Sequence, residues 1–103
     1  MAFYWMTFRI ADKTINGRKY EQRYQDVVET VSINASKMWT EPTSFIAFES
    51  ANSIQSLGQA LVSAIAPTDD MFLIREVDKQ SALLGGWNND DKIFDMISYL
   101  KYA

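Results

Sequence analysis

Residues 3–10, FYWMTFRI, decide the expected fold because they form the strand around which the other elements are arranged. The segment is rich in aromatic and β-branched residues, which is typical of strands. Alternation along a strand places Tyr4, Met6, Phe8 and Ile10 on one face and Phe3, Trp5, Thr7 and Arg9 on the other. Both faces carry large apolar groups, which predicts a central strand covered on both sides.

The rest of the sequence predicts the elements that follow this strand along the chain. In order, they are a helix at 18–33, a hairpin at 36–49, a helix from about 54 to 66, a strand at 71–77, a short strand at 81–84 and a final helix after Asn88 or Asn89. Arg23 is expected among the charged residues on the exposed face of the first helix, and Leu100 in the apolar stripe of the last.

The order β-α-β-β-α-β, with an extra short strand and a C-terminal helix, predicts an α+β fold of the ferredoxin-like type. It spans residues 1–103 as a single domain. Right-handed crossovers place both main helices on one face of an antiparallel sheet. The other face carries Phe3, Trp5 and Thr7, and an apolar surface of this kind is rarely left in water. We expect it to be covered by the C-terminal helix or by a second copy of the chain in a homodimer.

The composition restricts the possible chemistry. The sequence has no cysteine and no histidine, which excludes disulfides and thiolate metal sites and removes the usual proton shuttle at neutral pH. We expect no cofactor and no metal, and the sequence favours a non-enzymatic protein while leaving an enzyme open. No apolar run reaches the roughly 20 residues of a membrane helix, and the first residues do not resemble a signal peptide. We expect no membrane partner and a cytoplasmic location.

Charge is distributed unevenly along the chain. Residues 1–40 hold six basic and four acidic side chains, a net charge of +2. The net charge of the whole chain is −3, so residues 41–103 carry −5. The candidate residues for binding phosphate, RNA or DNA are Arg9, Lys13, Arg18, Lys19 and Arg23. The alternative is that they are simply solvated. The loop between the strand at 3–10 and the helix at 18–33 is not a P-loop, because Gly17 is its only glycine.

Aromatic residues invite a second comparison, with sheets that stack RNA bases on their central strands. Trp5, Phe45 and Phe48 are candidates, but the strand that contains Phe45 and Phe48 lacks the basic-glycine start of that signature. Phe45 and Phe48 also point to opposite faces of a strand. The pattern therefore favours packing in a core or a dimer. The Asp69-Asp70 pair is interpreted as an ordinary loop feature.

Several segments together resemble a known family. They are YWMTFRI, the paired Tyr20 and Tyr24, the strand Thr43-Ser44-Phe45-Ile46, Asp69-Asp70 before MFLIREV, and Gly86-Trp87. In this order the chain resembles the small SinR-family proteins, which look like the dimeric subunit of the CRISPR adaptation machinery and its VapD-type relatives. The resemblance implies a ferredoxin-like fold, a homodimer, and a bacterial or phage origin.

The resemblance has one departure that bears on activity. Nuclease activity has been attributed to some relatives through a metal-binding aspartate at the end of the first strand. Here Phe8 is followed by Arg9, and the nearest acid is Asp12. We expect Asp12 to be a structural loop acid that accepts hydrogen bonds from backbone N–H groups. The departure argues against carrying nuclease activity over.

Three functional hypotheses follow. The first is a small non-enzymatic interaction or accessory module that forms a homodimer, with Phe3, Trp5 and Thr7 packing at the dimer or sheet face. The second is a nucleic-acid-binding protein that uses the basic residues named above. The third, least favoured, is a metal-dependent ribonuclease that uses Asp12.

Overall fold

The computed structural model describes residues 1–103 and has an α+β architecture with one six-stranded sheet and three helices. The elements are β1 (Ala2–Arg9), α1 (Tyr20–Asn34), β2 (Lys37–Trp39), β3 (Phe45–Ser50), α2 (Ile54–Ala64), β4 (Met71–Glu76), β5 (Ser81–Gly86), α3 (Lys92–Met96) and β6 (Leu100–Tyr102). The predicted α+β class is confirmed, and the elements up to β5 lie close to their predicted positions.

The sheet has the strand order β2-β3-β1-β4-β5-β6. The strand β1 is central, as predicted, and pairs antiparallel with both β3 and β4. The pairs β2–β3 and β4–β5 are also antiparallel, whereas β5 and β6 are parallel, so the sheet is mixed. The expectation of a purely antiparallel sheet was therefore wrong at its last strand.

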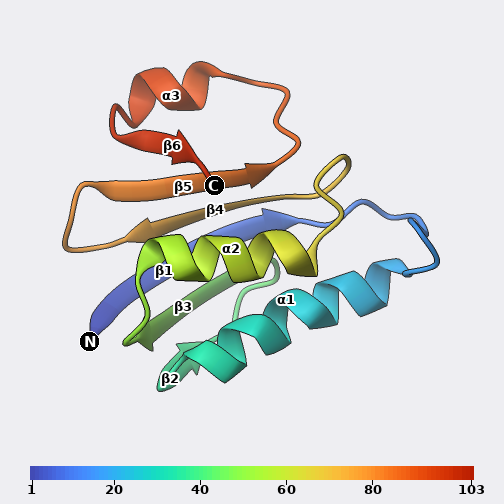
Figure 1. Ribbon diagram of the computed structural model, residues 1–103, viewed down its shortest axis with the longest axis horizontal. Coiled ribbons are helices and arrows are strands. Elements are labelled where there is room, and N and C mark those ends of the chain that lie inside the picture. The colour runs from blue at the N-terminus through green and yellow to red at the C-terminus, as the bar shows by residue number, and fades with distance from the viewer.

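Helices α1 and α2 lie side by side on one face of the sheet, as Figure 1 shows. The alternation predicted for β1 is confirmed, because Tyr4, Met6 and Phe8 point under these helices and are at most 5% exposed. Phe48 from β3 and Phe72 from β4 complete the aromatic part of this core. Burial of such large side chains stabilises the fold by about 1.5–3 kcal/mol each relative to an exposed position.

The C-terminal segment differs from its prediction. Helix α3 has only five residues, and Leu100 lies in β6 rather than on a helix. The sequence pattern misled because the apolar residues of two different elements fall, by coincidence, at helical spacing. The added strand extends the sheet by pairing with β5, from Ala82↔Leu100 to Leu84↔Tyr102.

We call the sheet face opposite α1 and α2 the open face, and α3 covers only part of it. The side chains of Leu73, Ala82, Leu84 and Leu100 form a small second core on the open face of β4, β5 and β6. Partly buried residues of α3 and its flanks, Ile93, Phe94 and Ile97, pack against this core. The C-terminal helix therefore covers one half of the open face, and the half formed by β1, β2 and β3 is left without a covering helix.

No helix in the structure combines the length and the apolar character that crossing a bilayer requires.

Candidate functional site

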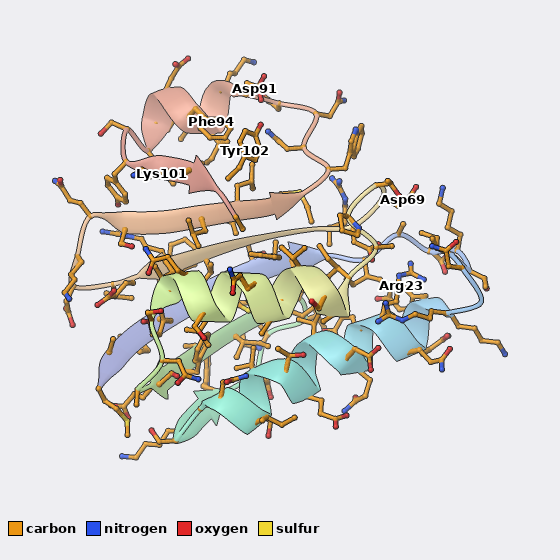
Figure 2. All side chains as sticks on the ribbon, in the orientation of Figure 1. Arg23, Asp69, Asp91, Phe94, Lys101 and Tyr102 are labelled. Atoms are coloured by element: carbon orange, nitrogen blue, oxygen red, sulfur yellow. The ribbon has the colours of Figure 1, made fainter.

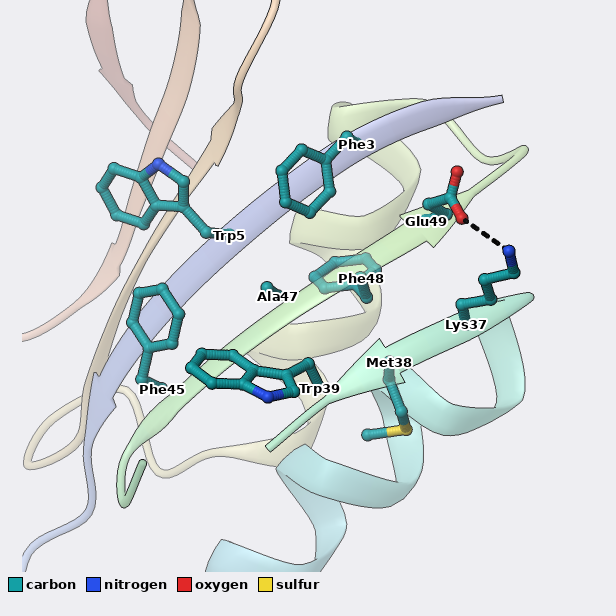
Figure 3. A pocket seen from close by; sticks show the side chains of 9 residues that line it. All are labelled: Phe3, Trp5, Lys37, Met38, Trp39, Phe45, Ala47, Phe48 and Glu49. Carbon is teal, nitrogen blue, oxygen red and sulfur yellow. Dashed lines mark ion pairs between the residues drawn. The ribbon is translucent and has the colours of Figure 1, made fainter. Parts of the chain in front are cut away.

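The uncovered half of the open face carries a cluster of aromatic side chains. Strand register places them there: Trp5 is opposite Ala47, and Ala47 is opposite Trp39, so all three share one face. Phe3 and Phe45 follow at alternate positions of β1 and β3. We call Phe3, Trp5, Trp39, Phe45 and Ala47 the aromatic surface. Its rings surround the small Ala47 side chain, as Figure 3 shows.

The aromatic surface is a shallow hollow rather than a flat patch. Its volume is about 770 Å³, and Lys37, Met38, Phe48 and Glu49 complete its lining. Trp5 and Phe45 are stacked with ring centroids 6.1 Å apart, and Trp39 meets Phe45 edge-on at 6.3 Å. These contacts fix the orientation of the rings, because aromatic pairs favour offset and edge-to-face geometries.

Several of these rings remain accessible to solvent. Trp39 is 53% exposed and Phe3 is 42% exposed, while Trp5 and Phe45 are half-buried. Large aromatic residues are normally well buried in folded domains, so their concentration on one half of one sheet face is the unusual feature of this molecule. Seven of the nine residues that line the hollow are hydrophobic, and its two charged residues are Lys37 and Glu49.

Charged residues flank the aromatic surface on two sides. Lys37 and Glu49 lie together on β2 and β3, with Lys37 Nζ and Glu49 Oε1 4.0 Å apart. Arg75 lies opposite Trp5 on β4, and its guanidinium carbon is 5.8 Å from the ring centroid of Tyr99. Arg75 Nε is buried and has no hydrogen-bond partner.

The residues predicted to pack at the sheet face occupy it. Phe3, Trp5 and Thr7 all lie on the open face, and Thr7 is exposed there. Sequence reasoning missed Trp39, because the three-residue β2 is too short to show a pattern by itself. Its face becomes apparent only from its pairing with β3, where Trp39 is opposite Ala47.

The predicted basic residues do not form one free patch. Lys13 Nζ lies 2.8 Å from Asp69 Oδ1, and the hydrogen bond from Lys13 holds the pKa of the Asp69 carboxyl below its usual value. Arg18 Nη2 donates to the Asp26 carboxylate at 2.5 Å and to the carbonyl oxygen of Ala64 at 2.7 Å. These two cations therefore hold the loop and the two main helices together.

The remaining exposed cations of this set lie apart. Arg9 is on the open face, where Nη2 donates to the carbonyl oxygen of Trp87 at 3.2 Å and the guanidinium carbon is 5.3 Å from the Trp87 ring centroid. Lys19 precedes α1, is exposed and forms no ion pair. The tight turn at Asn16-Gly17, where both residues have positive φ, separates these two residues along the chain.

The expectation that Arg23 lies on the exposed face of α1 was wrong. Its side chain is fully buried, and Figure 2 shows it directed from α1 toward the neighbouring loops. Nε donates to Asp70 Oδ2 at 2.9 Å, and Nη1 and Nη2 donate to the carbonyl oxygens of Lys13, Arg18 and Ala11 at 2.6–2.9 Å. A guanidinium so enclosed is not accessible to a phosphate, so we no longer count Arg23 among the candidate binding residues.

The expected loop acid is Asp70 rather than Asp12. Asp70 is fully buried and accepts hydrogen bonds from the backbone N–H groups of Ala11 and Ala66, both at 2.8 Å. Asp12 is exposed and accepts no hydrogen bond. The sequence did not distinguish Asp70 from the exposed Asp69 beside it, because both follow a helix-ending proline. No three acidic side chains come together in an arrangement that could hold a metal ion.

Comparison with protein-family models, with curated proteins and with solved structures gave no match.

Proposed function

We propose that the protein is a small non-enzymatic interaction module that acts as a homodimer joined through the aromatic surface. The observation that carries the proposal is the division of the open face. Helix α3 packs against the apolar side chains of β4, β5 and β6, whereas those of β1, β2 and β3, which are larger, have no such cover.

The physical argument is the cost of leaving aromatic rings in water. Burying apolar surface releases about 25 cal/mol for every Å² removed from water, so covering several large rings is a substantial driving force. Protein interfaces are enriched in Trp, Tyr and Phe at their centres, and such anchors provide much of the binding energy. The aromatic surface has this composition, with charged residues confined to its edges.

The test is the mass of the protein in solution, measured by light scattering at several concentrations. The chain has a mass of 11.8 kDa, and we expect twice this value. Trp39→Lys replaces one of the rings of the aromatic surface by a charge, at a residue that is 53% exposed in one chain, and we expect it to give a monomer. The matched control is Ile33→Lys, an exposed apolar residue on α1, which we expect to remain a dimer.

Either of two results would contradict the proposal. One is a wild-type protein that stays monomeric over the micromolar range. The other is a Trp39→Lys dimer as stable as the wild type. Circular dichroism of both variants verifies that the fold is intact, since each replaces an exposed side chain.

The proposal extends to the fold type. A ferredoxin-like core is supported by the order β2-β3-β1-β4 with every neighbouring pair antiparallel, and by the two helices on one face. In that description β5, α3 and β6 are an extension at one edge. The likeness to the SinR family agrees with a dimer of this kind and stays a prediction.

Nucleic-acid binding is the second candidate, and the same surface is what favours it. Bases stack on exposed aromatic side chains, each stack contributing about 1–3 kcal/mol. Arg9, Lys37 and Arg75 lie on the open face, and Glu49 is the acidic residue among them. We rank it second because the total charge of −3 opposes the approach of a polyanion. Titration with a mixed-sequence single-stranded RNA tests it.

A further inference from the structure

The side chain of Arg75 is in an unusual position. It emerges from β4 onto the open face beside Trp5, and its Nε is buried without a hydrogen-bond partner. Buried polar groups in folded proteins nearly always have a partner, and a charged one without a partner is costly. No carboxylate lies within ion-pair distance of Arg75 in the chain, and its guanidinium carbon lies over the face of the Tyr99 ring, 5.8 Å from the centroid.

Glu49 is in the complementary position. It lies on β3, at the other side of β1, and it is the acidic residue on the edge of the aromatic surface. Its only ion pair, with Lys37, is long at 4.0 Å, and the Lys37 side chain is 84% exposed. Exposed pairs of this kind contribute little, so Glu49 is available to a second partner.

These two positions are related in a way that suits a symmetric dimer. A two-fold axis repeats every contact, so a cation and an anion at separate places on one surface pair twice when two copies meet. On the sheet, Arg75 is level with Trp5, and Glu49 is level with Phe3. The point midway between them lies on β1, between the open-face residues Phe3 and Trp5.

We propose that Arg75 of one copy pairs with Glu49 of a second copy across the interface formed by the aromatic surface, which sets the orientation of the dimer. The inference rests on the proposed function. The two-fold axis runs parallel to the two sheets, over the midpoint and perpendicular to the line from Arg75 to Glu49, and it places Phe3 and Trp5 at the centre of the interface. With strands about 4.8 Å apart and residues about 3.4 Å apart along them, it also places Trp39 of one copy over Thr7 of the other.

The pairing is chemically strong where it forms. Arginine and a carboxylate make charge-assisted hydrogen bonds that are frequently bidentate. The second copy would exclude water from the guanidinium, and its Glu49 carboxylate would accept hydrogen bonds from the terminal nitrogens, which are not enclosed as Nε is. Opposite charges at fixed places also disfavour other orientations, because these bring like charges together.

The experiment is a charge exchange, read by sedimentation of the wild type, Arg75→Glu, Glu49→Arg and the double variant. Each single variant brings like charges together at both copies of the pair, and we expect a dimer dissociation constant about 100-fold higher or more. The double variant, and an equimolar mixture of the two single variants, restore opposite charges at both contacts. We expect both to dimerise within about 10-fold of the wild type.

The controls separate this inference from the function on which it rests. Lys101→Glu reverses a charge on β6, at the opposite edge of the sheet from β2, and we expect less than about a 5-fold effect because the residue is exposed and lies outside the aromatic surface. A wild-type dimer whose single variants are unaffected, or whose mixture shows no recovery, overturns the Arg75–Glu49 pairing and leaves the homodimer intact. A wild-type monomer overturns both. A third outcome is a monomer that binds single-stranded RNA and an Arg75→Glu variant that does not. It would also overturn both the homodimer and the Arg75–Glu49 pairing, and it would indicate that Arg75 binds a phosphate.

Discussion

Replacing Arg23 by methionine tests whether the buried ion pair between Arg23 and Asp70 holds the loop between β1 and α1 to the rest of the fold. Methionine keeps an unbranched apolar stem like that of arginine and removes the charged guanidinium. The substitution leaves Asp70 buried without its cation, and it removes the donor to the carbonyl oxygens of Ala11, Lys13 and Arg18. The loop between β1 and α1 is thereby released from α1.

The expected loss of stability follows from these contacts. Breaking a buried pair by removing one partner costs about 3–5 kcal/mol, because an uncompensated charge stays behind. A domain of this size has a total stability of about 5–15 kcal/mol, so the loss is a large fraction of the whole. With a urea dependence of about 2 kcal/mol per M, the unfolding midpoint should fall by about 2 M.

The assay is urea unfolding followed by far-UV circular dichroism at pH 7, with every variant at the same protein concentration. Gln25→Met is the matched control, because Gln25 is exposed on the same helix and the two residue types have similar helix propensities. We expect the control to stay within about 0.5 kcal/mol of the wild type. An Arg23→Met variant within about 1 kcal/mol of the wild type would refute the role assigned to the pair.

A double substitution sharpens the result. Asp70→Ala should also cost about 3–5 kcal/mol, since it leaves a buried guanidinium unpaired and removes the acceptor for the N–H groups of Ala11 and Ala66. Arg23→Met combined with Asp70→Ala removes both charges together. Its loss should therefore be well below the sum of the two single losses, because residues in one network are not independent. Simple additivity would show that the two side chains act separately.

Two further predictions concern stability. Burial and the Glu76 charge raise the pKa of Tyr4, which donates a hydrogen bond to the carbonyl oxygen of Asn52. Tyr4→Phe should cost about 1 kcal/mol at pH 7. This difference should shrink above about pH 10, where tyrosine ionises in the unfolded wild type before it does in the folded protein, as urea unfolding against pH would show. Gly86→Ala should lower the melting temperature much more than Gly17→Ala: both glycines have positive φ, but a Cβ at Gly86 would overlap a neighbouring backbone, whereas at Gly17 it meets open space.

Local pattern was sufficient for most of the fold. The alternation of FYWMTFRI identifies the central strand, and Pro42 and Pro67 mark the ends of elements as proline should. The pattern failed at the C-terminus, where a short helix and a short strand together imitate one longer helix. Elements this short carry too few residues to define a period, so only their pairing with the sheet determines them.

The candidate site was predictable in part. Alternation alone assigns Phe3, Trp5 and Thr7 to the open face, but Trp39 joins them only through the pairing of β2 with β3. Arg23 was misassigned for a different reason. A charged residue on a helix is normally solvated, and its burial depends on Asp70, which is 47 positions away in the sequence. Such a long-range pair leaves no periodic signal in either segment.

The dependence of binding on salt concentration distinguishes the two candidate functions of the aromatic surface, dimerisation and RNA binding. The forces that drive them respond to salt differently. Burial of aromatic rings is not weakened by moderate salt, and a pair enclosed in an interface is screened less than a free one. The dimer constant should therefore change by less than about 5-fold between 50 and 200 mM salt. If Arg9, Lys37 and Arg75 each neutralised one phosphate of a single strand, the same change would weaken binding about 20-fold. Sedimentation and RNA titration across this range measure both quantities, and a dimer that dissociates steeply with added salt would contradict an interface held by its aromatic rings.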